Sequence, residues 1–126
     1  MAVQVKYSLC VDISSLPFGG FKSGVIQNTV TFKEAVGVTL TVADATSDLP
    51  ISLNHVDRVQ MLFMWSDQPV IVKLITPGGN LASTPGFELL PNVPSLLSVK
   101  NIVEMYVTNG SGQQATVILQ GAGVTT

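Results

Sequence analysis

Side chains able to do acid–base, nucleophilic or metal chemistry are few in this chain and lie far apart. The 126 residues contain one histidine, His55, and one cysteine, Cys10. Asp57, two residues after the histidine, is the kind of carboxylate that orients the imidazole of a serine triad. The serine would have to be one such as Ser52 or Ser66, and no spacing in the sequence brings either of them to the pair. The pattern favours a histidine at the edge of a loop.

The remaining candidates also lack companions. Cys10 falls on the polar side of an alternating segment with no histidine nearby, so we expect a space-filling residue and not a nucleophile. Asp44 and Asp48 share a loop, but their spacing matches no EF-hand and they supply too few oxygens for calcium. The sequence therefore predicts that the protein is not an enzyme, with no catalytic, cofactor-binding or metal-binding residues and no cofactor.

Composition narrows the choice of partners. Charged residues make up only 11% of the chain, against roughly 25% in typical soluble domains. The net charge is −2 and the six basic residues are scattered, which argues against nucleic acid, because phosphates require clustered Lys and Arg. No apolar run approaches the ~20 residues of a membrane span, and the first residues do not form the apolar core of a signal peptide. We expect neither nucleic acid nor a membrane as a partner, and the lone cysteine fits synthesis in a reducing cytoplasm.

The elements that would position any site are strands. Residues 3–13 alternate apolar and polar side chains, which predicts a long half-buried strand. Residues 14–24 are rich in glycine and form a loop that carries Phe18 and Phe21. These two rings either tuck under the edge of the sheet or contact a partner.

Two hairpins follow from the phase of the apolar residues. The first turns at residues 33–35 and pairs Phe32 with Val36, with a single long bent strand as the alternative. The second turns at residues 109–113 and pairs Val107 with Ala115.

Residues 59–75 are the most apolar part of the chain. Two apolar runs flank the turn-forming residues 66–69, which predicts a hairpin that pairs Trp65 with Val70 and is apolar on both faces. One face can line the domain's own core, whereas the other needs a second cover, either a partner or residues 81–97 folded over it. With the two phenylalanines of the loop, the candidate interface residues are Leu62, Met64, Ile71, Ile75, Phe18 and Phe21.

The whole chain reads as one domain, residues 1–126, of about eight strands. Pro85, Pro91 and Pro94 exclude a long helix in the least regular part and leave room only for short or edge strands. Strands at this spacing predict an all-β fold, an antiparallel β-sandwich or barrel, and eight strands fit a jelly roll.

The C-terminal hairpin carries a resemblance. The runs VTNGSG at residues 107–112 and ATVILQG at residues 115–121 resemble the last hairpin of small all-β virion proteins of tailed and related bacteriophages, including capsid decoration and minor capsid proteins. The run LPNV at residues 90–93 and the low-charge, Thr- and Val-rich composition are similar in style. The resemblance implies a structural role in the virion, as a homo-oligomer, a trimer, bound to the major capsid protein or another virion protein.

A different class of function is also open, a carbohydrate- or receptor-binding module. Trp65, Tyr7 and Tyr106 could together form a platform on which a sugar ring stacks. All three occur within alternating apolar strands, however, where an aromatic side chain usually belongs to the core.

Overall fold

A computed structural model describes residues 3–9, 12–13, 21–22, 26–32, 34–53 and 56–124. The strands are β1 (Val3–Leu9), β2 (Asp12–Ile13), β3 (Phe21–Lys22), β4 (Ile26–Phe32), β5 (Glu34–Val42), β6 (Thr46–Ile51), β7 (Arg58–Ser66), β8 (Val70–Ile75), β9 (Phe87–Leu89), β10 (Ser95–Ile102), β11 (Glu104–Asn109) and β12 (Ala115–Val124). A single 3₁₀ turn, η1 (Leu81–Ser83), is the one helical element of these residues. No helix in the described ranges is long and apolar enough to cross a membrane.

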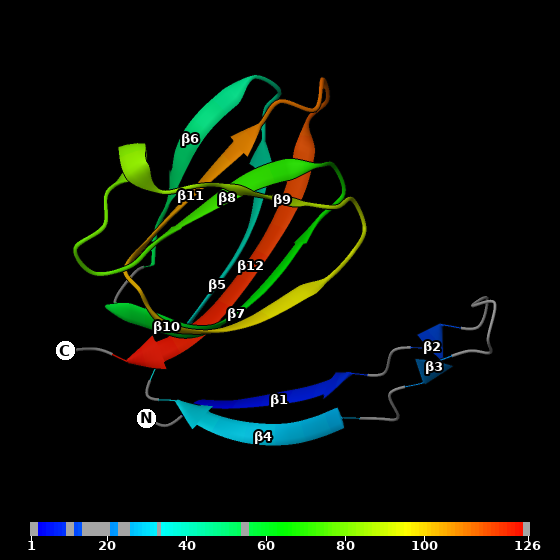
Figure 1. The fold of residues 1–126 in the computed structure, drawn as a ribbon, viewed down its shortest axis with the longest axis vertical. Helices are drawn as coiled ribbons and strands as arrows, with labels where there is room; N and C mark the ends of the chain where they lie inside the picture. Colours follow the sequence, from blue (N-terminus) through cyan, green and yellow to red (C-terminus); the bar gives the residue numbers. More distant parts are fainter. Residues whose placement is uncertain are drawn as a thin grey trace.

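Strands β5 to β12 form a sandwich of two antiparallel sheets, in the orders β10-β7-β12-β5 and β6-β11-β8-β9. The first of these strands pairs with the last, β5 with β12, and the pattern continues inward as β6 with β11, β7 with β10 and β8 with β9. This order is that of a jelly roll. It confirms the all-β antiparallel sandwich predicted from the sequence, and the sheets remain two separate layers (Figure 1).

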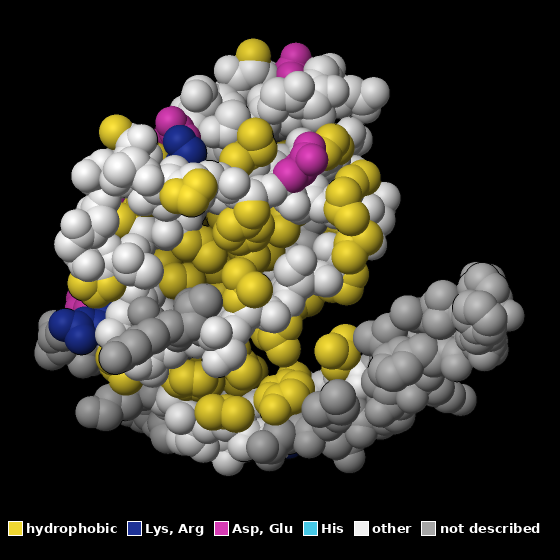
Figure 2. All heavy atoms as spheres, viewed as in Figure 1, with side chains coloured by type: hydrophobic (Ala, Val, Ile, Leu, Met, Phe, Trp, Pro, Cys, Tyr) yellow, Lys and Arg dark blue, Asp and Glu magenta, His cyan; other side chains and the backbone are white. Residues whose placement is uncertain are grey.

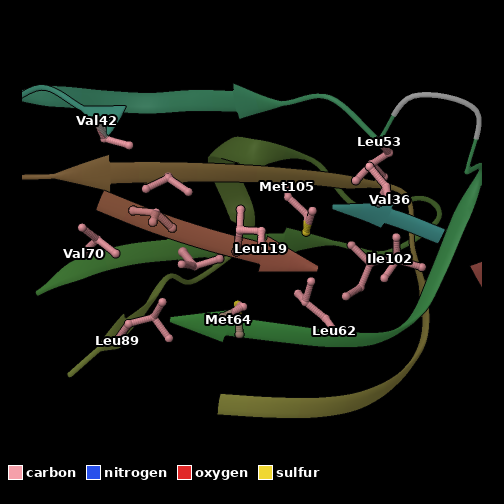
Figure 3. Packing of buried hydrophobic residues seen from close by; sticks show 14 of the residues in the cluster. Val36, Val42, Leu53, Leu62, Met64, Val70, Leu89, Ile102, Met105 and Leu119 are labelled. Carbon is pink, nitrogen blue, oxygen red and sulfur yellow. The ribbon is translucent and has the colours of Figure 1, made fainter. Parts of the chain in front are cut away.

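The hydrophobic core lies between the two sheets. Figure 3 shows Leu62 and Met64 of β7 pointing into it together with Leu119 of β12, and each of the three is at most 1% exposed. Val72 and Val107, from the opposite sheet, are fully buried against the same cluster. Alternate side chains of the strands therefore point into the space between the two sheets and fill it, as expected for sheets packed face to face.

Two glycines let the longest strand, β12, pass close to β7. A Cβ at Gly123 would collide with the backbone carbonyl of Arg58, next to a β-bulge between Ala122 and Gly123. A Cβ at Gly121 would sit 3.0 Å from Val59 Cγ1. The missing side chains thus permit a close approach at the centre of the sheet.

A two-stranded ribbon lies beside the sandwich. β1 pairs with β4 in the register Val3↔Phe32 to Leu9↔Ile26, and the short pair β2–β3 continues the ribbon away from the sandwich (Figure 1). On β1, Val5 and Tyr7 are half-buried while the residues between them are exposed. The strand predicted over residues 3–13 is therefore present as two strands, β1 and β2, with different partners. Val5 and Tyr7 are half-buried as expected, whereas Leu9 is 53% exposed.

The three predicted hairpins are wrong. β7 and β8 belong to different sheets, so Trp65 pairs with Ile118 and not with Val70. β11 and β12 are also separated, so Val107 pairs with Val72 and Leu49.

At the turn predicted for residues 33–35, Phe32 pairs with Val3 and Val36 with Gly121, so the pairing of Phe32 with Val36 is absent. β4 ends at Phe32 and β5 begins at Glu34 in a different sheet, which is closer to the alternative of one long bent strand. In a jelly roll most consecutive strands cross from one sheet to the other, and such crossings use the same polar residues as hairpin turns. At the β7–β8 crossing, Asp67 Oδ1 accepts a hydrogen bond from the backbone N–H of Thr116 at 2.8 Å, which ties the connection to β12.

Candidate interaction surface

The outer face of the sheet β10-β7-β12-β5 carries a strip of apolar side chains along β7, with polar side chains such as Gln120, Thr39 and Thr41 at other outward positions. Leu62 and Met64 of β7 point inward, so Met61, Phe63 and Trp65 point outward, and these three are half-buried. The register adds apolar neighbours on the same face: Ile118 lies opposite Trp65, Ala122 opposite Met61 and Leu96 opposite Phe63. We call these six residues the apolar outer face.

A groove of about 770 Å³ separates part of this face from the β1–β4 ribbon. Its ribbon wall includes Val5, Tyr7 and Leu9, and its sheet wall includes Phe63 and Leu96. Figure 2 shows hydrophobic side chains on both sides of the space between the sandwich and the ribbon. Two of the lining side chains remain largely in solvent, since Leu9 is 53% and Leu96 41% exposed.

The groove holds almost no charge. Among its described lining residues Lys6 is the one charged side chain, and Lys6 is exposed on the polar side of β1. An occupant of the groove would consequently be held by apolar contact, whose strength follows the area removed from water.

The outer face of the opposite sheet is polar. The backbone N–H of Asp48 donates to Thr108 Oγ1 at 2.9 Å, and Asp48 Oδ1 lies 3.5 Å from Lys73 Nζ. Tyr106 donates a hydrogen bond to Glu104 Oε2 at 2.8 Å. This hydrogen bond, with the negative charges of Glu104 and Asp48 nearby, raises the pKa of Tyr106 above its usual value. The outer face of this sheet therefore carries the polar side chains expected of a solvent-exposed surface.

Three of the predicted interface residues belong instead to the interior. Leu62 and Met64 are 0% exposed and Ile75 is 1% exposed, so the domain itself covers them. The error has a physical cause: residues 59–65 are apolar on both faces, and strand period alone does not tell which face turns inward.

The other predicted interface residues have different outcomes. Ile71 is 41% exposed on the polar outer face, above Gly86, where a Cβ would collide with its Cγ2 atom. Phe18 lies outside the described residues, as does the side chain of Phe21, so their predicted roles stay predictions.

The candidate catalytic groups do not assemble into a site among the described residues. His55 and Cys10 lie outside the described ranges, and the predictions about them are untouched. The hydroxyl of Ser66 is buried and donates to the carbonyl of Gln68 at 2.7 Å, which stabilises the β7–β8 connection. Within the described part of the chain, no group of three or more His, Cys, Asp or Glu could hold a metal ion.

The predicted aromatic platform is not formed. Trp65 lies on the apolar outer face and Tyr7 on the ribbon, whereas Tyr106 lies on β11, on the outer face of the opposite sheet. The thickness of the sandwich therefore separates Tyr106 from Trp65, and no one sugar could stack on all three rings.

Sequence reasoning missed the residues that line the groove, above all Met61, Phe63 and Leu96. Residues 59–65 are apolar on both faces, so the sequence is equally compatible with Leu62 and Met64 facing the core and Met61 and Phe63 facing outward.

No family model, no curated protein and no solved structure matches this chain. The likeness of residues 107–121 to phage virion proteins stays an expectation from the sequence.

Proposed function

We propose that the protein is a non-enzymatic structural component of a virus particle, a capsid decoration or minor capsid protein, which assembles through the apolar outer face. The observation that carries the proposal is the exposure of apolar side chains, Leu96 and Leu9 above all, around a mainly apolar groove on one outer surface of the sandwich. An outer sheet surface of a free monomer normally carries polar side chains, and a contiguous apolar one marks a protein contact.

The energy available at this face is sufficient for assembly. Fully burying one large apolar side chain contributes ~1.5–3 kcal/mol. For Met61, Phe63 and Leu96, which are partly buried already, about half of that sum remains, or about 2–5 kcal/mol per copy. A particle multiplies such a contribution over many copies, so a modest contact is adequate there.

The fold and composition support the same reading. The jelly roll is widespread in viral capsid domains, although it also occurs in lectins and cupins, so this support is an analogy at the level of the fold. The resemblance of residues 107–121 points to phage virion proteins in particular. The low fraction of charged residues, 11%, fits a chain that exposes little of its surface alone. The proposed partner is the major capsid protein or another virion protein.

Density-gradient sedimentation of virus particles from cells that make this protein tests the proposal. The unmodified chain should travel with the particles, and so should Leu90→Glu, a change at a side chain that is 61% exposed and does not line the groove. Leu96→Glu should leave the chain at the top of the gradient, because it puts a charge on the apolar outer face. Purified particles that lack the unmodified chain, or that retain Leu96→Glu equally well, would contradict the proposal.

A further inference from the structure

We infer that the free edge of β5 is a second contact site, which binds an extended segment of a neighbouring particle protein as an added β-strand. The inference rests on the proposed function and deepens it, since it names the part of the partner that is bound and the way in which it is bound. The segment has apolar side chains at alternate positions and polar, uncharged side chains between them.

The free edge of β5 is defined by its one partner strand among the described residues, β12. On β12, the N–H of Thr116 donates to Asp67 Oδ1 at 2.8 Å, and the carbonyl of Thr116 accepts from the N–H of Asp67 at 3.2 Å. Both backbone groups of Thr116 therefore point toward β7 and not toward β5. Thr41, opposite Thr116, consequently stands in a non-hydrogen-bonded pair, and its own N–H and C=O point away from β12.

This orientation repeats along β5. The register between β5 and β12 covers the whole of β5 without a shift. Hydrogen-bonded and non-hydrogen-bonded pairs alternate in such a ladder, so every second residue has its backbone groups on the free edge: Ala35, Gly37, Thr39 and Thr41. A regular row of unpaired donors and acceptors is a template for a further strand.

The other three edges of the sandwich have features that hinder strand addition. β6 contains Pro50, and Asp48 within it has a φ of 49°. β9 has only three residues, and β10 has a register shift around Asn101, whose φ is 65°. From Ala35 to Val42, β5 has no proline, no charged residue, no bulge and no positive φ. Since edge strands normally carry such protection, β5 is the edge of the four that is suited to receive a strand.

The core is also partly open beside this edge. Val38 and Leu40 point inward from β5 but are only partly buried against the core cluster, whereas Val42 is 1% exposed. An added strand with apolar side chains at every second position would cover Val38 and Leu40. On the outer side, Thr39 and Thr41 are exposed and would lie beside polar side chains of the added strand. The chemistry of the segment follows from these two sides.

The edge is too small to hold two free copies of the chain together. The strand from Ala35 to Val42 is ~27 Å long, and a sheet with its side chains is ~10 Å thick. Pairing along it buries about 270 Å² on each partner, or about 540 Å² in total, well below the ~1,200 Å² of specific interfaces. When the chain is already held on a particle through its apolar outer face, a neighbouring segment is present at a high effective concentration, and the same small contact is sufficient. The occupant is therefore a protein of the particle and not a second free copy.

A fluorescently labelled peptide with the sequence of residues 115–122 is a suitable probe, because this segment pairs with β5 on its other side. Fluorescence anisotropy should show that the peptide binds the unmodified chain and that a peptide of the same residues in scrambled order does not. Thr39→Pro removes an N–H from the free edge and should weaken binding about tenfold. Thr39→Val keeps that N–H and should bind like the unmodified chain.

A second variant guards against a folding defect in Thr39→Pro, which urea unfolding would reveal. Thr41→Lys puts a charge on the edge, keeps every backbone N–H and should also weaken binding. An unmodified chain that does not bind the peptide, or equal binding by the unmodified chain and Thr41→Lys, would overturn the inference.

Sedimentation with virus particles separates this inference from the proposed function. The unmodified chain and Thr39→Val should travel with the particles, and a larger share of Thr39→Pro should stay at the top of the gradient. Equal retention of all three chains would overturn the edge site and leave the proposed function standing. An unmodified chain that binds the peptide but never travels with particles would overturn the proposed function and, with it, the occupant named here. A loss of self-association in Thr39→Pro, measured by light scattering, would identify a second copy as the occupant and overturn the inference.

Discussion

The two outer faces of the sandwich are built on the same architecture and differ in almost everything else. On the sheet β6-β11-β8-β9, Asp48, Lys73 and Thr108 form a polar network, and Tyr106 is hydrogen-bonded to Glu104. On the sheet β10-β7-β12-β5, the equivalent outward positions carry the six residues of the apolar outer face. Both are four-stranded and antiparallel. One outer face is therefore mainly polar, whereas the other carries a strip of apolar side chains along β7.

A sheet with one wet face alternates apolar and polar side chains, which β11 does: Met105 and Val107 are buried, and Glu104 and Tyr106 point outward. β7 instead has large apolar side chains at every position from 61 to 65. Selection for solubility of a free monomer would remove such residues from an outward face. Contiguous apolar side chains of this kind are typical of a protein contact, which is what the proposed assembly requires.

The largest expected effect is a difference in the free energy of unfolding between substitutions at neighbouring positions on the two faces of β7. Leu62→Ala removes a fully buried side chain and should lower the free energy of unfolding by ~2–5 kcal/mol. Met61→Ala, one residue away on the half-buried outer face, should cost less than about 1.5 kcal/mol, because partial exposure leaves less to lose. Urea unfolding followed by circular dichroism measures both. Equal losses would mean that the outer face belongs to the core.

An intermediate effect is expected where the interior does hold a polar side chain. Asn109 is fully buried; its amide nitrogen donates to the carbonyls of Val42 at 3.0 Å and Gln113 at 2.7 Å, and its oxygen accepts from Ser111. Asn109→Ala leaves these groups unpaired and should cost ~1–3 kcal/mol. Thr108→Val, next to it on the polar outer face, should cost less than about 1 kcal/mol. Thermal unfolding measures the loss of stability in the two variants. A larger loss for Thr108→Val than for Asn109→Ala would contradict the prediction.

A smaller effect is expected from the ion pair of the polar face. Lys73→Met removes the partner of Asp48, but both side chains are partly exposed, 25% and 33%, so the pair contributes less than about 1 kcal/mol. Self-association should stay unchanged, because the proposed assembly uses the opposite, apolar outer face. A Lys73→Met chain that gains or loses an oligomer in light scattering would show that the polar face takes part in assembly.

The smallest effect concerns the pH dependence of the polar face. The hydrogen bond to Glu104 raises the pKa of Tyr106 in the folded chain above its usual value. A raised pKa in the folded state gives stability that is present below the pKa of the unfolded state and is lost as the pH rises through that of the folded state. In a Tyr7→Phe background, Glu104→Gln should lower the pKa of Tyr106 in an absorbance titration of the phenolate. An unchanged titration would show that the hydrogen bond is broken in solution.

Local alternation was enough to predict the strands and the fold class. It identified the half-buried first strand, the short strand near Phe87 and the absence of a long helix around Pro85, because side-chain period and proline geometry act over a few residues. The expected count of about eight strands matches the sandwich only in number: it included β1 and β4, which lie outside the sandwich, and missed β6, which holds Asp48 and lies in a stretch expected to be a loop. The jelly-roll order was only one compatible outcome, because pairing β5 with β12 joins residues that are far apart in the sequence.

The pairings and the interface failed for a related reason. A polar cluster such as residues 66–69 shows that the chain reverses, but not whether the next strand joins the same sheet or the opposite one. A hairpin of β7 and β8 would place Met64 and Ile71 on the same surface. In the structure Met64 is 0% and Ile71 41% exposed, on different sheets. The inference that β7 needs a second cover remains a prediction, now for Met61 and Phe63.

The same substitution made on each outer face distinguishes a contact surface from a solvent-exposed one. Leu96 and Ile71 are both 41% exposed, Leu96 on the apolar outer face and Ile71 on the polar one. Light scattering at micromolar concentration should give an unmodified chain that contains at least two copies, a Leu96→Glu chain that is monomeric, and an Ile71→Glu chain that matches the unmodified one. An unmodified monomer, or an oligomer lost with Ile71→Glu and kept with Leu96→Glu, would contradict the account.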